Sequence, residues 1–199
     1  LIMIYLACAA IAYLIGSFCA SIPLSKKLYG ADIRTKGSGN AGATNMARVY
    51  GMKAGAVTFA LDAVKTMAAM LIGAHLGGQT GEAIAGAFCV VGHCFPIYFG
   101  FRGGKGVSVG AALGFMTHPL AFCIIMAVFF TVAMLGRKVS LASMTAAAAL
   151  PLAAWVTDAG RMLVVMCIFS ALLVIFMHRS NIIRLVSGTE PDFSPKKFN

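Results

Sequence analysis

Long apolar runs separated by short polar segments make up most of this chain. A helix needs about 20 residues to cross a bilayer, and apolar runs of about that length lie near residues 1–24, 53–75, 82–100, 119–136, 140–157 and 160–178. A further apolar stretch, Val107–Thr117, is shorter and would cover only about half of a ~30 Å hydrocarbon core. His118 precedes Pro119 and is therefore biased out of helical geometry, so we expect a helix break there.

The composition supports this pattern. Hydrophobic residues make up 60% of the chain and charged residues 11%, and the mean hydropathy is +0.88, which is more apolar than a water-soluble domain of this size requires. We predict an all-α integral membrane protein with a single domain over residues 1–199. The first run lacks a basic leader and a small-residue cleavage site, so we interpret it as an anchor.

The basic residues decide between two topologies, because Lys and Arg collect in cytoplasmic loops. If the short stretch is a crossing, the protein has seven transmembrane helices, its amino terminus lies outside and its carboxyl terminus lies in the cytoplasm. Arg161 is then on the outer side, and the other basic residues outside the helices share the cytoplasmic side: Lys26, Lys27, Arg34, Lys36, Arg48, Lys53, Arg102, Lys105, Arg137, Lys138, Arg179, Arg184, Lys196 and Lys197. Six crossings would divide them between both sides, so we predict seven.

The six cysteines all fall in predicted helices without paired spacing. This favours apolar packing over disulfides. His93 and Cys94, next to Cys89, come nearest to a metal cluster, but a second ligand pair is missing. We therefore assign His93 a structural role and expect no metal site.

The first polar segment, residues 25–52, contains GSGNAGATNMAR from Gly37 to Arg48. Its glycines allow successive backbone N–H groups to turn inward, and a short helix is expected from Thr44 to Tyr50, which together form an anion site. The alternative is a flexible connector. The candidate phosphate-binding and catalytic residues here are Ser38, Gly39, Asn40, Thr44, Asn45 and Arg48.

This segment also matches the dinucleotide fingerprint G-x-G-x-x-G, with Asp62 twenty residues beyond Gly42. That fingerprint requires a preceding strand and a βαβ unit, whereas an apolar helix is expected here. We therefore reject dinucleotide binding.

A second polar segment, GFRGGKG, precedes the short helix and offers Gly103, Gly104, Lys105 and Gly106 as a phosphate-binding loop. The alternative is that Arg102 and Lys105 are interface anchors. The segment is not a Walker A loop, because that motif needs a glycine where Phe99 stands and a hydroxyl residue where Gly106 stands.

The third segment, HRSN, places His178 and Asn181 on one face if the helix continues. Together they offer a proton acceptor or donor and an amide that stabilises charge. Arg179 and Arg184 are expected to contact lipid headgroups. We expect Glu190 to tie the tail to this basic face through a structural salt bridge.

Three further polar positions remain. Asp62 and Lys65 lie three residues apart inside a predicted span, where we expect a structural ion pair. Ser140 is expected to cap the helix that begins there. Ser143, one turn on, either reaches a bound anion or packs between helices.

The three segments resemble the motifs of the bacterial acyl-phosphate:glycerol-3-phosphate acyltransferase family. The resemblance rests on Gly-Ser-Gly-Asn-x-Gly-x-Thr-Asn-x-x-Arg at 37–48, Gly-His-x-x-Pro-x-x-x-x-Phe-x-Gly-Gly-Lys-Gly at 92–106, and His-Arg-x-Asn-Ile-x-Arg-Leu-x-x-Gly-x-Glu at 178–190. By position, Ser38 and Arg48 match the essential polar residues of the first motif. The family's glycerol-phosphate loop is matched by Gly103, Gly104, Lys105 and Gly106, and its third motif by His178, Asn181 and Glu190.

The resemblance implies transfer of a fatty acyl group from acyl phosphate to the sn-1 hydroxyl of glycerol 3-phosphate at the cytoplasmic face of the bacterial inner membrane. The implied partners are these two substrates, membrane lipid and the peripheral enzyme that makes acyl phosphate, with no cofactor and no nucleic acid. The base is either His178 or a substrate phosphate. An organophosphate transporter and a non-enzymatic scaffold are the alternative functions.

Overall fold

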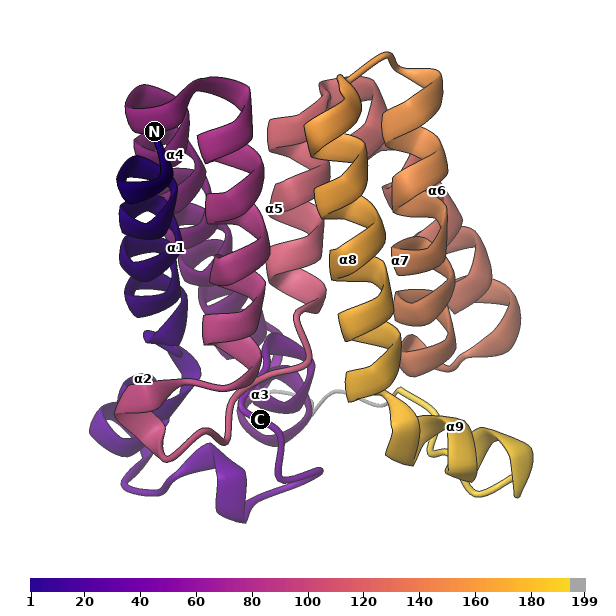
Figure 1. The fold of residues 1–199 in the computed structure, drawn as a ribbon. Helices are drawn as coiled ribbons and strands as arrows, with labels where there is room; N and C mark the ends of the chain where they lie inside the picture. Colours follow the sequence, from indigo (N-terminus) through magenta and orange to yellow (C-terminus); the bar gives the residue numbers. More distant parts are fainter. Residues whose placement is uncertain (194–199) are drawn as a thin grey trace.

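The described residues, 1–193, form a bundle of helices without a strand in a computed structural model (Figure 1). The α-helices are α1 Ile2–Ser17, α2 Ser21–Tyr29, α3 Ala43–Tyr50, α4 Met52–Cys94, α5 Val107–Thr117, α6 Pro119–Gly136, α7 Val139–Val156, α8 Arg161–Met177 and α9 Arg179–Val186. Two short 3-10 helices, η1 Ile33–Thr35 and η2 Ile97–Phe99, lie in the polar segments. The all-helical prediction is therefore confirmed for the described residues.

Helix α4 is a hairpin rather than one straight helix. Its 43 residues include non-helical backbone at Gly77 and Gly78, and Gly78 has a φ of +60°, a conformation that glycine adopts without strain. The two arms pack so closely that a Cβ at Gly81 would lie 2.3 Å from the Gly73 carbonyl oxygen. Small residues permit such an approach. The two arms correspond to the runs predicted near 53–75 and 82–100.

Two predicted spans contain a helix break that the sequence did not indicate. The first apolar run was expected to continue to residue 24, but α1 ends at Ser17 and α2 begins at Ser21. The run expected to reach residue 100 ends at Cys94 and continues as η2. Hydropathy measures composition, so it detects neither break. The predicted break before Pro119 is present, and the Nδ1 of His118 accepts a hydrogen bond from the Leu120 amide (3.1 Å).

Length and composition identify four membrane-spanning candidates among the described residues: Ile2–Tyr29, Met52–Phe99, Pro119–Gly136 and Val139–Val156. Helices α8 and α9 make a fifth if the pair, bent by 57°, counts as one span. The candidate Met52–Phe99 contains both arms of the α4 hairpin. Helix α5, with 11 residues, is too short to be counted as a span. Seven crossings and the orientation of the termini therefore stay predictions.

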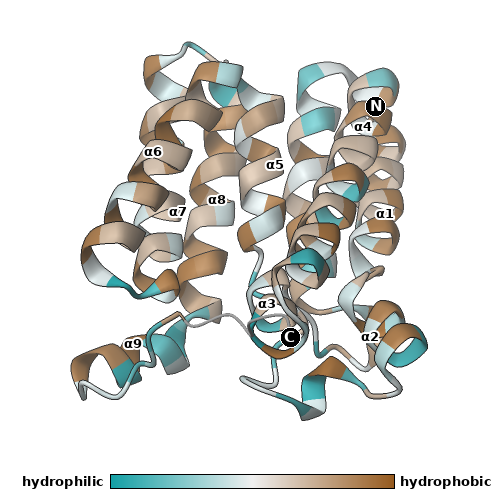
Figure 2. Cartoon of the chain, turned by 180° about the vertical axis from the view of Figure 1, so that it is seen from behind, coloured by the Kyte–Doolittle hydropathy of each residue, from teal (hydrophilic) through white to brown (hydrophobic). Residues whose placement is uncertain are grey.

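One end of the bundle carries the three polar segments. Helices α2, α3 and α9 lie at the lower end in Figure 1, whereas the amino terminus and the bend of α4 lie at the upper end. Figure 2 shows hydrophilic residues gathered at that lower end and mostly hydrophobic residues along the helices. Lys196 and Lys197, which we predicted on the same side, lie outside the described residues.

The prediction that the cysteines are packing residues is confirmed for five of the six, whereas Cys123 is exposed. All six are unpaired, and five of them are buried: Cys8, Cys19, Cys89, Cys94 and Cys167. Small apolar side chains of this kind fill the contacts between closely packed helices.

The α4 hairpin generates a stability prediction. We expect Gly81→Ala to lower the free energy of unfolding by about 1–3 kcal/mol, because the added methyl group overlaps the facing backbone. Gly110→Ala, on α5, is the matched control, since a Cβ there meets nothing within 4 Å and alanine favours a helix by about 0.5–1 kcal/mol. Thermal unfolding in detergent measures both. Equal midpoints for the two variants would contradict the close packing.

Candidate active site

The first polar segment is held in shape by the Asn45 side chain. Its Oδ1 accepts a hydrogen bond from the Ser38 amide (2.9 Å), and its Nδ2 donates to the carbonyls of Lys36 (3.0 Å) and Asn40 (2.9 Å). Asn45 is buried at the start of α3, and Gly37 has a φ of +56°. These bonds argue against a flexible connector. They also make Asn45 part of the framework of the loop, a role that sequence analysis did not assign to it.

The second polar segment packs against His93. The Gly104 amide donates to the His93 carbonyl (3.0 Å). A Cβ at Gly104 would lie 2.0 Å from His93 Nε2, and one at Gly103 would lie 2.0 Å from the His93 carbonyl oxygen. Glycine is required at both positions by this close approach. Sequence analysis attributed these glycines to phosphate binding and missed the contact.

The first two segments form one unit. The Gly103 carbonyl accepts hydrogen bonds from the Ala41 amide and from Asn40 Nδ2, each at 3.4 Å. Arg34 donates to the Phe99 carbonyl (2.7 Å) and pairs with Asp32 (2.8 Å). The hydrogen bonds from Arg34 hold the pKa of Asp32 well below its usual range. Segments about 60 residues apart are thereby joined.

The third segment contributes two buried side chains, His178 and Asn181. His178 Nδ1 lies 2.8 Å from the Val174 carbonyl. A carbonyl only accepts, so Nδ1 carries the hydrogen and Nε2 is the acceptor. Burial lowers the pKa of His178 to about 4, and the nearby Lys105 charge acts in the same direction. Asn181 Oδ1 accepts a hydrogen bond from Lys105 Nζ. His178 is therefore neutral near pH 7, and Lys105 joins the second segment to the third.

Glu190 ties the tail to this face through the predicted salt bridge, in which Oε2 lies 2.7 Å from Arg184 Nε. Its Oε1 accepts from the Ser140 hydroxyl (2.5 Å) and from Asn181 Nδ2 (2.7 Å). Burial raises the pKa of Glu190, but these three hydrogen bonds outweigh it and the pKa lies below its usual value. The prediction that Ser140 caps a helix is wrong, since α7 has no side-chain cap and the hydroxyl serves Glu190.

A cavity of about 770 Å³ lies where the three segments meet. Its polar lining includes Ser38, Asn40, Thr44, Arg48, Lys105, Ser143, His178, Asn181, Arg184 and Glu190. Its apolar lining comes largely from α6, α7 and α8 and includes Ile125, Met126, Phe129, Phe130, Leu150 and Val174. The Ser143 hydroxyl also donates to the Val139 carbonyl (2.8 Å). One cavity thus combines cationic and apolar walls.

The pKa of the Lys105 ammonium, which lines the cavity, lies below its usual value. Burial lowers its pKa to about 8, and the charges of Arg184 and Arg48 lower it further, while Glu190 opposes them. A bound anion would stabilise the ammonium.

Asp62 and Lys65 lie deeper in the bundle, beside His93, which also lines the cavity. Lys65 Nζ is 3.0 Å from Asp62 Oδ1, so the predicted ion pair is present, and His93 Nδ1 joins it at 3.0 Å from the same ammonium. Asp62 lies inside α4 and the helix α2 precedes the glycine run, which agrees with the rejection of a dinucleotide site. Among residues 1–193, no three His, Cys, Asp or Glu side chains are grouped to hold a metal.

These features define a helical membrane protein with one cavity that has both cationic and apolar walls. Residues 6–188 match the family described as glycerol-3-phosphate acyltransferase. The chain belongs to this family, so the family predicted from the sequence is confirmed.

Individual relatives agree over nearly the whole chain. A glycerol-3-phosphate acyltransferase from Thermoanaerobacter pseudethanolicus is 43% identical over 188 residues, covering 94% of this chain and 95% of that protein. One from Listeria monocytogenes is 40% identical over 185 residues, covering 91% and 92%. The crystal structure of PlsY, an integral membrane glycerol 3-phosphate acyltransferase, in its glycerol 3-phosphate form has a TM-score of 0.89 and 36% identity, with 96% of each chain covered. Its lysophosphatidic acid form has a TM-score of 0.87 and 34% identity, with 96% of this chain and 95% of that one covered.

The lowered pKa of His178 predicts a pH-dependent loss of stability. The unfolded side chain binds a proton below about pH 6.5, whereas the folded one binds it only near about pH 4. Stability is therefore lost as the pH falls between these values, by about 2 kcal/mol from pH 7 to pH 5. We expect the unfolding midpoint of His178→Gln to depend less on pH over this interval. The exposed His75→Gln should retain the full loss, and an identical profile for all three proteins would contradict the assignment.

Proposed function

We propose that this protein transfers a fatty acyl group from acyl phosphate to the sn-1 hydroxyl of glycerol 3-phosphate. The products are lysophosphatidate and inorganic phosphate, and the reaction is the first acylation of phospholipid synthesis. Family membership supports the acceptor and the reaction class. The observation that carries the proposal is the single cavity in which Arg48, Lys105 and His178 face an apolar wall.

The chemistry needs orientation and charge neutralisation more than activation. Acyl phosphate is a mixed anhydride with phosphate as a good leaving group. The acceptor hydroxyl oxygen forms a bond to the carbonyl carbon, the bond from that carbon to the phosphate oxygen breaks, and the hydroxyl proton passes to a base. Holding donor and acceptor in one cavity contributes most of the required orientation. Neither a metal nor a covalent enzyme nucleophile is required by this step.

Two cations neutralise the two phosphates in this proposal. Lys105 comes from the second segment and Arg48 from α3, and both line the cavity. We assign Lys105 to glycerol 3-phosphate and Arg48 to the donor phosphate, with charge-assisted hydrogen bonds to each. Ser38, Asn40 and Thr44 add neutral donors beside them.

Two groups can receive the hydroxyl proton. The first is His178 Nε2, since Nδ1 is engaged with the Val174 carbonyl. The second is a substrate phosphate, whose second pKa is near about 6. The pKa of about 4 makes His178 the weaker base of the two, but an imidazole acceptor still orients the hydroxyl toward the carbonyl. Asn181 holds Lys105 in place through its Oδ1.

The same proposal places the site in the cell. Lys and Arg favour the cytoplasmic side, so we infer that the polar end of the bundle faces the cytoplasm of a bacterial inner membrane. Seven crossings then put the amino terminus outside. A soluble or peripheral enzyme that makes acyl phosphate would deliver the donor to this face, and the product would pass into the membrane.

The direct test is purified protein with palmitoyl phosphate and labelled glycerol 3-phosphate. Formation of labelled lysophosphatidate that requires the acyl phosphate supports the proposal. Uptake of glycerol 3-phosphate into sealed vesicles without an acyl donor, and without product, would overturn it in favour of a transporter. If neither lysophosphatidate nor uptake is observed, the result favours a non-enzymatic scaffold.

Lys105→Ala tests the assignment of the second segment. We expect the KM for glycerol 3-phosphate to rise about 10- to 100-fold, because a charged hydrogen bond contributes about 1.5–3 kcal/mol. The matched control is Arg102→Ala, three residues earlier in the same segment and exposed, for which we expect a KM near that of the unmodified protein. Equal effects of the two substitutions would favour the interface-anchor alternative.

His178→Ala separates the two candidate bases. At saturating glycerol 3-phosphate, single-turnover rates report the chemical step without the binding step. We expect a fall of about 10²–10⁴-fold if His178 accepts the proton. A near-normal single-turnover rate would exclude His178 as the base and assign the proton to the substrate phosphate.

A further inference from the structure

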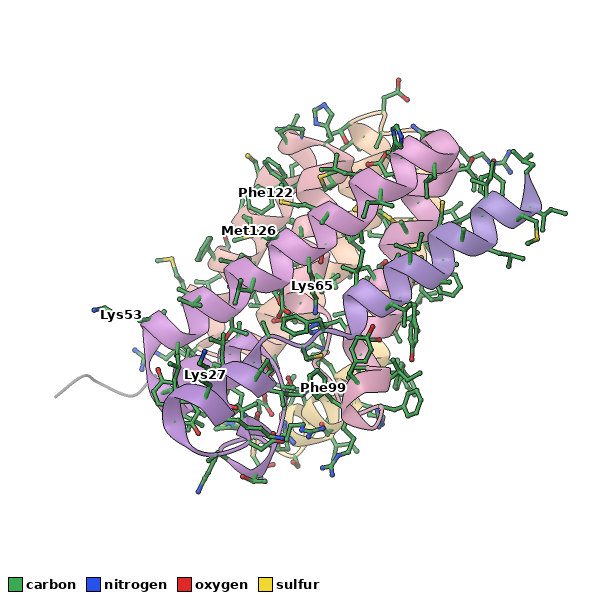
Figure 3. All side chains as sticks on the ribbon, turned by 90° about the vertical axis from the view of Figure 1, so that its left-hand side faces the viewer. Lys27, Lys53, Lys65, Phe99, Phe122 and Met126 are labelled. Atoms are coloured by element: carbon green, nitrogen blue, oxygen red, sulfur yellow. The ribbon has the colours of Figure 1, made fainter. Side chains whose placement is uncertain are left out.

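Ionisable side chains buried in the apolar part of the bundle form a cluster that the proposed chemistry leaves unexplained. Lys65 Nζ lies 3.0 Å from Asp62 Oδ1 and 3.0 Å from His93 Nδ1, and Asp62 Oδ2 accepts a hydrogen bond from the Ser108 hydroxyl (2.9 Å). Figure 3 shows Lys65 among the helices, whereas Lys53 of the same helix projects at the edge. Ionisable groups inside a membrane are costly, so each is a candidate for a function.

The hydrogen bonds of Lys65 determine the orientation of the His93 ring. The ammonium donates to the carbonyls of Gly16 (3.0 Å) and Phe18 (2.8 Å), where α1 ends. An ammonium has no acceptor, so His93 Nδ1 accepts and Nε2 carries the hydrogen. The Nε2 edge faces Gly104. The tautomer and the direction of the ring are thus set from inside the bundle.

The ring in turn supports the segment that carries Lys105. The Gly104 amide donates to the His93 carbonyl, and the ring occupies the space that a Cβ of Gly104 would need. Lys105 is the next residue and reaches into the cavity toward Asn181. A change in the position of the His93 ring would therefore move the backbone from which Lys105 projects.

We propose that Asp62, Lys65 and His93 are positioning residues for Lys105. Asp62 balances the charge of Lys65, Lys65 fixes the His93 ring, and the ring holds Gly104 so that the Lys105 ammonium meets the phosphate of glycerol 3-phosphate. This inference rests on the proposed function in that Lys105 binds that substrate. The competing view is that the cluster only holds α1 and the two arms of α4 together.

Two substitutions of His93 separate these views. Asparagine retains an acceptor near the position of Nδ1, so His93→Asn keeps the bond to Lys65 but removes the part of the ring beneath Gly104. Glutamine reaches near the position of Nε2, so His93→Gln replaces part of that support. If the cluster has only a structural role, His93→Asn should have the same KM values for both substrates as the unmodified protein.

We expect His93→Asn to unfold at nearly the unmodified temperature but to raise the KM for glycerol 3-phosphate about 10- to 100-fold, because a displaced Lys105 would lose its charged hydrogen bond to the phosphate. The KM for acyl phosphate should change much less. The KM of His93→Gln for glycerol 3-phosphate should lie between that of His93→Asn and that of the unmodified protein. An unchanged KM in His93→Asn, or equal changes for both substrates, would overturn the positioning role.

A double-mutant cycle tests the contact itself. Gly104→Ala should raise the KM for glycerol 3-phosphate at least about 10-fold alone, since its methyl group overlaps the His93 ring. In the His93→Asn background, Gly104→Ala should not raise this KM further, because the ring that its methyl group would overlap is absent. Gly103→Ala is the control, since its methyl group meets the His93 carbonyl oxygen, which the substitution retains, so its effect should persist in full. Additive effects for both glycines would overturn the proposal.

Failure of the positioning role is distinguishable from failure of the proposed function. If the unmodified protein makes no lysophosphatidate, the proposed function fails. If it makes product but the cycle is additive, only the positioning role fails. Should His93→Asn not accumulate as a folded protein, the same cycle with His93→Gln decides the question, because a flexible glutamine can withdraw from the alanine methyl group.

Discussion

The contact between His93 and the glycine pair at 103 and 104 is the interaction on which the rest of the site depends. It brings the segment 95–106 back against the helix from which it emerges, with less than one methyl group of space between them. Gly103 then receives hydrogen bonds from the first polar segment, and Lys105 donates to Asn181 of the third. Three regions distant in sequence meet because this one turn is tightly packed.

The bundle around this contact separates two environments in one cavity. Phosphate chemistry needs cations and fixed donors, while a fatty chain needs apolar walls. Lys105 and Arg48 supply the first, and residues such as Phe129 and Leu150 supply the second. Because both line the same cavity, we propose that a substrate with a charged head and an alkyl chain is held with its reactive carbonyl between them. Such an arrangement is what acyl transfer to a small phosphorylated alcohol requires.

Much of this architecture could be predicted from sequence because it follows from one-dimensional patterns. The short helix Val107–Thr117 and the break at His118 follow from the length of an apolar run and from a proline. The gathering of three glycine-rich or polar segments at one end follows from the distribution of basic residues. The motifs themselves were sufficient to indicate the family.

The remaining features depend on contacts between distant residues. Nothing in the local pattern indicates that His93 accepts from Lys65, 28 residues earlier, because the α4 hairpin creates that contact. Asn45 looked like a ligand-binding amide, yet its hydrogen bonds close its own loop. Ser140 has the sequence position of a helix cap, but its hydroxyl donates a hydrogen bond to Glu190, fifty residues later. Polar residues in a membrane protein are read correctly only once their partners are known.

The most direct measurement of the central claim is a crystal or cryo-electron microscopy structure of this protein with glycerol 3-phosphate bound. The account predicts that the phosphate lies in the cavity between the first and second polar segments, within hydrogen-bonding distance of Lys105 Nζ, and that the Gly104–His93 contact is retained. A phosphate bound outside this cavity, or bound within it without contact to Lys105, would contradict the account.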